Sequence, residues 1–151
     1  MINLYPTKCN ICSGKVIYTS NAAIYGRPYG SGYCYYCTNC GAYVGTHKPE
    51  PKKAYGILAN AQMRTMKINC HAVFDNKWLG KPKARKKRKD LYRWLSVMMN
   101  IPLEECHFGY FDAEQLQKAY DILKQIENEE LIYDNKGNII NLFDKRKENT
   151  L

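Results

Sequence analysis

Two similar motifs set the fold of the first part of this chain: Cys9-Asn10-Ile11-Cys12-Ser13-Gly14 and Cys37-Thr38-Asn39-Cys40-Gly41. Two thiolates that stand two residues apart on a tight turn can both bind one ion, and two such pairs complete the tetrahedral shell that zinc prefers. Gly41 can turn the chain with a positive φ directly after the second pair. The motifs therefore predict one structural Zn²⁺ ion per chain, held by Cys9, Cys12, Cys37 and Cys40.

Cys34 leaves a second arrangement open, because it could supply the third ligand in place of Cys37. The spacing favours Cys37, since a metal-binding turn needs the shorter interval. Five cysteines within the first forty residues, with no basic and apolar leader before them, indicate metal ligation in a reducing compartment rather than disulfides. We therefore expect a cytoplasmic protein that has no membrane segment.

Three short runs rich in β-branched or aromatic residues, at 15–20, 32–36 and 42–46, predict three antiparallel strands around the metal. These strands would form a zinc ribbon over residues 1–50. A unit of this size buries too little apolar surface to fold alone, so the ion is expected to hold it together.

Apolar residues at helical spacing predict three helices further along the chain, over 60–74, 90–99 and 112–127. Asn60 is the expected N-cap of the first, and Asp112 to Gln115 has the form of a capping box. Residues 131–143 predict a terminal β-hairpin. The expected fold is thus α+β, with the ribbon packed with a helical domain over 55–143, and a charged tail at 144–151.

The positive charge of the chain is concentrated in its middle, where residues 61–100 hold eleven cations and two acids. Seven of the nine residues from 81 to 89 are basic, and we expect this segment to be a linker whose charges contact nucleic-acid phosphates. The alternative is a solvated linker without a partner. The candidate phosphate contacts are Lys83, Arg85, Lys86, Lys87, Arg88 and Lys89.

Seven of the thirteen tyrosines fall between residues 18 and 43. Rings on a small sheet can stack on unpaired bases, and Tyr25, Arg27, Tyr29 and Tyr35 are the candidate contacts. The alternative is that tyrosines pack the ribbon core, and strand alternation requires at least one of them to face inward.

A catalytic function is not expected. Four thiolates leave no open position for water on the ion, so hydrolytic zinc chemistry is excluded. Cys70 and His71 are adjacent on a predicted helix, where neighbouring side chains point about 100° apart, so they do not form a nucleophile and base pair. No small-molecule substrate is predicted.

A resemblance to a known family rests on five motifs that follow one another along the chain: Cys37 to His47, Gly56 to Asn60, Cys70 to Trp78, Tyr92 to Leu95, and Glu105 to Asp112. Over roughly residues 9–125 the chain resembles a zinc-finger-containing domain family of unassigned function from phages and bacterial mobile elements, which implies a bacterial host cell. The ribbon alone is similar to the C-terminal zinc ribbons of bacterial DNA topoisomerase I. Because those ribbons touch single-stranded DNA, that similarity implies DNA rather than RNA.

Two functions follow from these observations. The first is a zinc-stabilised, non-enzymatic nucleic-acid-binding protein that uses the ribbon tyrosines and the basic segment. The alternative is a phage-encoded regulator that binds a host protein or nucleoprotein complex, for example an inhibitor of a host nuclease or CRISPR effector.

Overall fold

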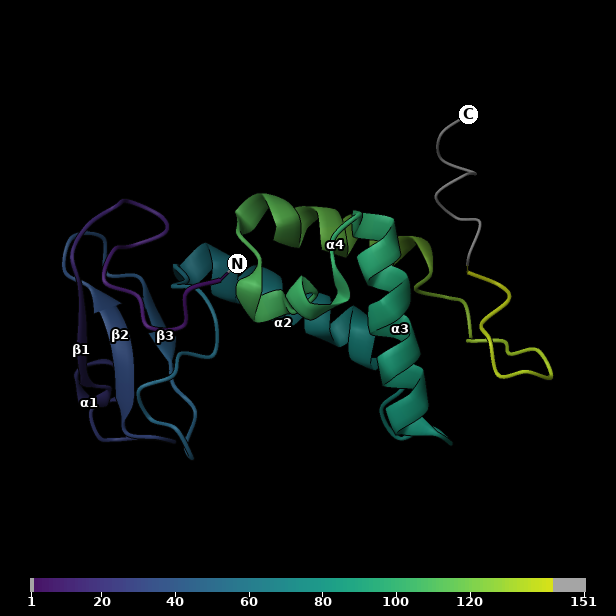
Figure 1. Ribbon diagram of the computed structural model, residues 1–151, viewed down its shortest axis with the longest axis horizontal. Coiled ribbons are helices and arrows are strands. Elements are labelled where there is room, and N and C mark those ends of the chain that lie inside the picture. The colour runs from purple at the N-terminus through teal and green to yellow at the C-terminus, as the bar shows by residue number, and fades with distance from the viewer. Residues whose placement is uncertain (1, 143–151) are drawn as a thin grey trace. The chain divides into compact units, whose positions relative to one another are not determined.

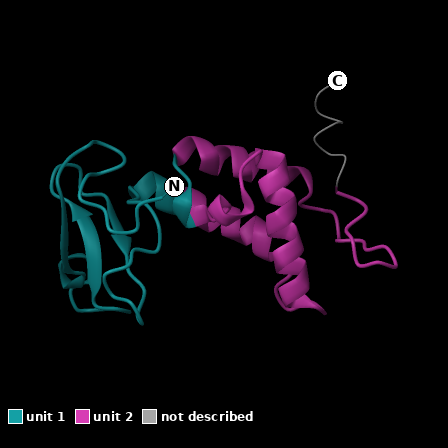
Figure 2. Cartoon of the chain, in the orientation of Figure 1, with its two compact units in different colours: residues 1–65, 109–112 teal, residues 66–108, 113–151 magenta. Residues whose placement is uncertain are grey.

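The computed structural model describes residues 2–142, and it divides the chain into two compact units (Figures 1 and 2). Unit 1 comprises residues 1–65 and 109–112, and unit 2 comprises residues 66–108 and 113–151. The predicted charged tail lies outside the described residues. No helix in the described part of the chain combines the length and the apolar character that a membrane crossing requires.

Unit 1 is built on an antiparallel sheet of three strands in the order β1-β2-β3. These are β1 (Val16–Ser20), β2 (Tyr33–Cys37) and β3 (Tyr43–Gly45), and a short helix, α1 (Ala22–Tyr25), lies between the first two in sequence. Aromatic and β-branched residues in these runs suit the pleated, half-buried surface of a sheet. The predicted three-stranded antiparallel sheet is confirmed.

The register of β2 distributes its side chains between two faces. Successive strand residues point to opposite sides, so Tyr35 and Cys37 share one face while Cys34 and Tyr36 share the other. The first face belongs to the core of unit 1, which is formed by Cys9, Val16, Tyr35, Cys37, Ala42, Val44, Ala54 and Leu58. The metal-binding motifs therefore border the core of the unit.

Unit 2 is helical. Its elements are α2 (Ala61–Asp75), which begins in unit 1, then α3 (Ala84–Met99), a short 3₁₀ turn (Leu103–Glu105), and α4 (Ala113–Gln125). A second 3₁₀ turn, Phe108–Tyr110, begins in unit 2 and ends in unit 1. Asn60 caps α2 as predicted, because its Oδ1 accepts a hydrogen bond from the Met63 N–H at 2.8 Å. The fully buried core residues include Cys70, Phe74, Leu91, Leu95, Leu116, Leu123 and Ile126. The α+β class is confirmed.

The basic segment is not a linker, and this part of the prediction is wrong. Residues 84–89 are the first six residues of α3, whereas the sequence pattern predicts a helix that begins only at Asp90. Lys and Arg are good helix formers, and the Lys86 Nζ donates to the Asp90 Oδ2 at 2.6 Å one turn later. The helix therefore extends through the basic run to the apolar face that starts at Leu91.

The terminal hairpin is not confirmed. Between 131 and 142 the structure has a single antiparallel bridge, between Tyr133 and Ile139, around a turn that contains Gly137 with φ +83°. The last residue of the predicted hairpin, at position 143, lies outside the described residues.

Candidate metal centre and aromatic surface

Two turns of the same construction bring four cysteines together in unit 1. In the first, the Cys9 N–H donates to the Gly14 carbonyl at 2.9 Å and the Ser13 N–H donates to the Cys9 carbonyl at 3.0 Å. In the second, the equivalent bonds run from Cys37 to Ala42 at 2.8 Å and from Gly41 to Cys37 at 3.0 Å. The residue after each motif has a left-handed backbone, with φ +67° at Ser13 and +79° at Gly41.

The four sulfur atoms of Cys9, Cys12, Cys37 and Cys40 all lie within 4.8 Å of one another. The Sγ atoms of Cys9 and Cys40 are 3.7 Å apart, and those of Cys12 and Cys37 are 3.4 Å apart. Ligand atoms around one tetrahedral ion with sulfur bonds of about 2.3 Å must be separated by distances of this order. The cluster can therefore bind one metal ion.

The backbone around the cluster is arranged to stabilise thiolates. The Ile11 N–H donates to the Cys9 Sγ at 3.3 Å, and the Cys40 N–H donates to the Cys37 Sγ at 3.4 Å. The Cys12 Sγ accepts from the Gly14 N–H and from the Asn39 Nδ2, each at 3.3 Å. Hydrogen bonds to a metal ligand orient it and tune the metal, so these donors belong to the centre.

Two thiols of the cluster, those of Cys12 and Cys40, differ in acidity. Hydrogen bonds from the Asn39 side chain and the Gly14 N–H lower the pKa of Cys12 to about 6. The Ala42 N–H lowers the pKa of Cys40, but desolvation and hydrogen bonds with the other three thiols raise it overall, to about 12. The Cys12 thiolate thus forms readily, whereas Cys40 needs a nearby cation to hold its thiolate in the charged form.

Gly14 leaves the space that the sulfur atoms occupy. A Cβ at this position would lie 2.6 Å from the Asn39 Cβ, 3.0 Å from the Cys37 Sγ and 3.1 Å from the Cys12 Sγ. Any larger residue would therefore displace the two turns from each other.

Cys37, rather than Cys34, is the fourth member of the cluster. Cys34 pairs with Thr19 and Gly45 and lies on the opposite face of β2, where it is 1% exposed. Burial raises the pKa of its thiol. The alternative ligand set with Cys34 is therefore wrong. Cys34 and Cys37 are three positions apart on one strand, so their side chains point to opposite faces and cannot bind the same ion.

A comparison with family models matches residues 5–126 to a zinc-finger-containing domain. The chain belongs to this zinc-finger family. The match extends through α4, so both units are part of the family domain. The four-cysteine cluster fits the zinc finger that the family description names, because thiolates in this number and spacing are the usual donors of structural zinc. Neither the curated proteins nor the solved structures that were compared give a match.

In this zinc-finger domain, two of the predicted stacking residues are exposed and one is not. Tyr25 is 51% exposed and Tyr29 is 72% exposed, and Arg27 lies in the exposed loop between them. Tyr35 is only 7% exposed, and its hydroxyl donates to the Lys52 carbonyl. The expectation that Tyr35 contacts nucleic acid is corrected, because its register on β2 directs it into the core.

Two further residues, which sequence reasoning missed, join the exposed tyrosines. The rings of Tyr25 and Tyr29 meet edge to face with centroids 5.6 Å apart, and Tyr25 meets Tyr43 at 6.5 Å with perpendicular planes. The Arg64 guanidinium lies 4.2 Å from the centroid of Tyr43. We call Tyr25, Tyr29, Tyr43 and Arg64 the aromatic surface. No local sequence signal joins Arg64 to these rings, since it lies on α2.

The predicted basic residues fall into two groups in unit 2. Arg85, Lys89 and the N-terminal Lys83 are exposed on or before α3. Lys86 instead donates to Asp90 and to the Gly137 carbonyl at 2.7 Å, and Arg88 lies over the rings of Tyr92 and Trp78 at 4.9 and 5.6 Å. Lys87 is half-buried. Lys86 and Arg88 therefore use their charges in contacts within unit 2, although both are exposed.

Two of the cysteines outside the centre, Cys70 and Cys106, are buried in unit 2. The Cys70 Sγ donates to the Leu116 carbonyl at 3.4 Å, and burial raises the pKa of its thiol to about 11. Burial also raises the pKa of Cys106 to about 12. The ring of His71 packs on Phe108 with centroids 4.8 Å apart. Cys70 and Cys106 are therefore parts of the core, whereas His71 covers Phe108 from an exposed position.

Proposed function

We propose that this protein is a non-enzymatic, zinc-stabilised module that binds single-stranded nucleic acid, DNA in the first instance, through the aromatic surface of unit 1. In this proposal Zn²⁺ is bound by Cys9, Cys12, Cys37 and Cys40 and has a structural role. The four sulfur ligands would fill a tetrahedral shell and leave no position for a substrate or an activated water.

The observation that supports nucleic-acid binding is the exposure of rings that have a cation beside them. Tyr25 and Tyr29 place more than half of their surface in solvent, although burying such rings is favourable. Bases stack on exposed tyrosines whatever their sequence, because every base has a π face. Arg64 at Tyr43 adds a guanidinium that can contact a phosphate or stack on a base.

The backbone next to Tyr25 and Tyr29 also leaves room for a ligand to approach closely. Gly26 and Gly30 have φ of +80° and +59°, and a Cβ at either position would meet no atom within 4 Å. A ligand that stacks on Tyr25 and Tyr29 would therefore find open space beside the rings.

Substitution of single rings tests the proposal. Tyr29→Ala and Tyr25→Ala should each weaken the affinity for random single-stranded DNA by ~1–3 kcal/mol per stacked base, measured by fluorescence anisotropy. Tyr29→Phe should retain the affinity, since the ring remains. Tyr5→Ala is the matched control, because Tyr5 is 55% exposed in the same unit but lies outside the aromatic surface.

Zinc content and circular dichroism of each variant show whether it is folded. Single-strand affinities that are equal in Tyr25→Ala, Tyr29→Ala and Tyr5→Ala would refute the proposal. Loss of binding to a host nuclease or nucleoprotein complex in Tyr29→Phe, with unchanged DNA affinity, would instead support the protein-binding alternative, because a phenol often donates a hydrogen bond across a desolvated interface.

A further inference from the structure

We infer that α3 carries a second nucleic-acid-binding surface, a stripe of Arg85, Lys89 and Arg93 that contacts the phosphate backbone of a duplex. We call these three residues the basic stripe. The inference rests on the proposed function only in that the chain binds nucleic acid, and it concerns unit 2 alone.

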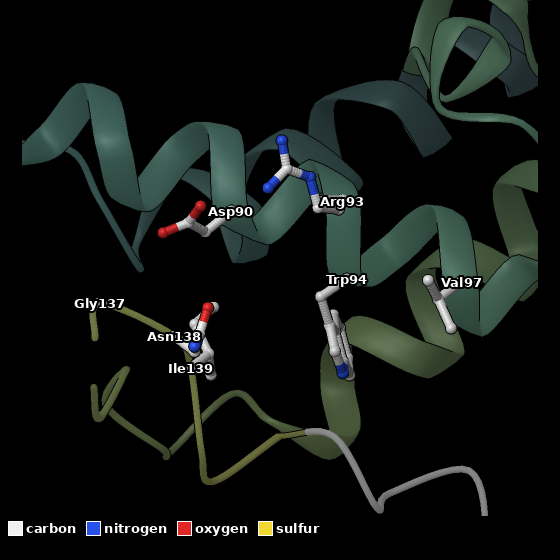
Figure 3. Close-up of a pocket in the computed structure, with 7 residues that line it drawn as sticks. All are labelled: Asp90, Arg93, Trp94, Val97, Gly137, Asn138 and Ile139. Carbon is white, nitrogen blue, oxygen red and sulfur yellow. The ribbon is translucent and has the colours of Figure 1, made fainter. Parts of the chain in front are cut away.

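The basic stripe follows from helix geometry. Residues four apart share one face of a helix, so positions 85, 89 and 93 project to the same side over ~12 Å of its length. All three are exposed. Leu91 and Leu95, on the opposite side of α3, are fully buried and hold the helix in place. Figure 3 shows the Arg93 guanidinium turned away from the 137–139 segment that lies across the neighbouring pocket.

Two other cations of α3, Lys86 and Arg88, have partners within unit 2. Lys86 bonds to Asp90 and to the Gly137 carbonyl, and its Nζ lies 4.7 Å from the centroid of Tyr133. Arg88 covers the rings of Trp78 and Tyr92. Within residues 2–142, no ion pair includes Arg85, Lys89 or Arg93. Their charges therefore remain for an external anion.

The start of α3 is unfavourable without such an anion. Residues 84–93 hold six cations and one acid, and the first turn has no acidic residue. Lys83, at the N-cap position, has a left-handed backbone (φ +55°) and makes no side-chain capping hydrogen bond. Cations oppose the helix dipole at this end, and like charges four residues apart repel each other. A polyanion along the stripe would offset both effects.

A duplex fits the stripe better than unpaired bases do. The rings near it are already packed, since Trp94 is 3% exposed and its Nε1 donates to the Leu142 carbonyl, while Tyr92 packs on Phe74 at 4.3 Å. Contacts here are therefore made by cations, and phosphate contacts need no unpaired base. An α-helix also fits the major groove of B-DNA, whose walls are lined by phosphates.

The test compares two triple variants of the full chain. Arg85→Gln, Lys89→Gln and Arg93→Gln together should reduce the slope of log K against log salt for a random duplex by ~2.7, because each phosphate contact contributes ~0.9. The control removes the same charge from unit 2 through Lys118→Gln, Lys124→Gln and Lys136→Gln, which are exposed and lie outside α3. The control should leave the slope nearly unchanged.

Further arms separate this inference from the proposed function. Tyr29→Ala should reduce single-strand affinity and leave the duplex slope unchanged. If Tyr29→Ala has no effect while the stripe variant still reduces the slope, the aromatic surface fails and the stripe stands. An equal effect of the stripe and control variants would overturn the inference, and so would stripe-dependent binding to anionic phosphatidylserine vesicles without duplex binding.

Discussion

The side-chain amide of Asn21 holds Tyr29 through both of its backbone polar groups. The Asn21 Nδ2 donates to the Tyr29 carbonyl at 2.7 Å, and the Tyr29 N–H donates to the Asn21 Oδ1 at 3.0 Å. Asn21 itself is only 4% exposed, so its amide is largely shielded from competing water. The most exposed ring of the aromatic surface therefore stands on a fixed backbone, which reduces the entropy lost when a base stacks on it.

Removal of this amide should loosen Tyr29 without touching its ring. We expect Asn21→Ala to accelerate amide hydrogen exchange at Tyr29 and to weaken single-strand affinity by about 1 kcal/mol, the usual worth of such hydrogen bonds. Asn10→Ala is the matched control, since Asn10 holds Leu58 in the same way, with bonds of 3.0 and 2.9 Å. The control should reduce the stability of unit 1 and leave amide exchange at Tyr29 unchanged. Faster exchange at Tyr29 in Asn10→Ala but not in Asn21→Ala would contradict the role of Asn21.

The two candidate third ligands should behave differently on substitution. Cys37→Ser should abolish stoichiometric zinc and unfold the ribbon, because metal binding contributes ~10–16 kcal/mol to folding in small zinc peptides. Cys34→Ser should retain one zinc per chain, since Cys34 lies on the other face of β2. Metal analysis of protein purified without chelator measures both. Zinc loss in Cys34→Ser alone would show that the ligand set is misassigned.

Gly14 should tolerate no side chain. Gly14→Ala should weaken zinc binding and cost about 1–3 kcal/mol of stability, because the added methyl group would lie 2.6 Å from the Asn39 Cβ. Gly30→Ala is the control. Its Cβ would meet no atom within 4 Å, so this variant introduces backbone strain at φ +59° without crowding any neighbour. Chelator competition should find weakened zinc binding in Gly14→Ala only, and equal zinc affinity in both variants would contradict this account.

The stability of unit 2 should fall on mild acidification. Desolvation, reinforced by the positive charge of Arg88, lowers the pKa of both His71 and His107, although Asp75 opposes the shift at His71. Between the lowered pKa and the ordinary value of about 6.5, the unfolded chain binds more protons than the folded one, so stability decreases as pH falls through this window.

Tryptophan fluorescence isolates that effect, because both Trp78 and Trp94 belong to unit 2. The denaturation midpoint in urea should decrease from pH 7 to pH values below 6.5, and His71→Gln combined with His107→Gln should flatten the dependence. If the urea midpoint of the double variant changes with pH as much as that of the wild type, the acid sensitivity comes from other groups.

The spacing of residues along the chain was sufficient to predict many elements of this protein. The Cys-x-x-Cys motifs identified the metal turns because their geometry is set within six residues, and the apolar periodicity located α2, α3 and α4 because a helix repeats over few residues. The start of α3 was missed for a local reason as well: a run of Lys and Arg carries no apolar signal, although it favours a helix.

Local sequence was enough to predict two metal turns, three short strands and three helices, because the signals for these elements lie among neighbouring residues. Only the tertiary structure decided which cysteine completes the metal cluster and which tyrosines reach solvent. Cys34 and Cys37 lie on one strand, and the strand register directs them to opposite faces, while burial against the core separates Tyr35 from the exposed Tyr29. The pairing of Arg64 with Tyr43, twenty-one residues apart on a helix and a strand, could come only from folding.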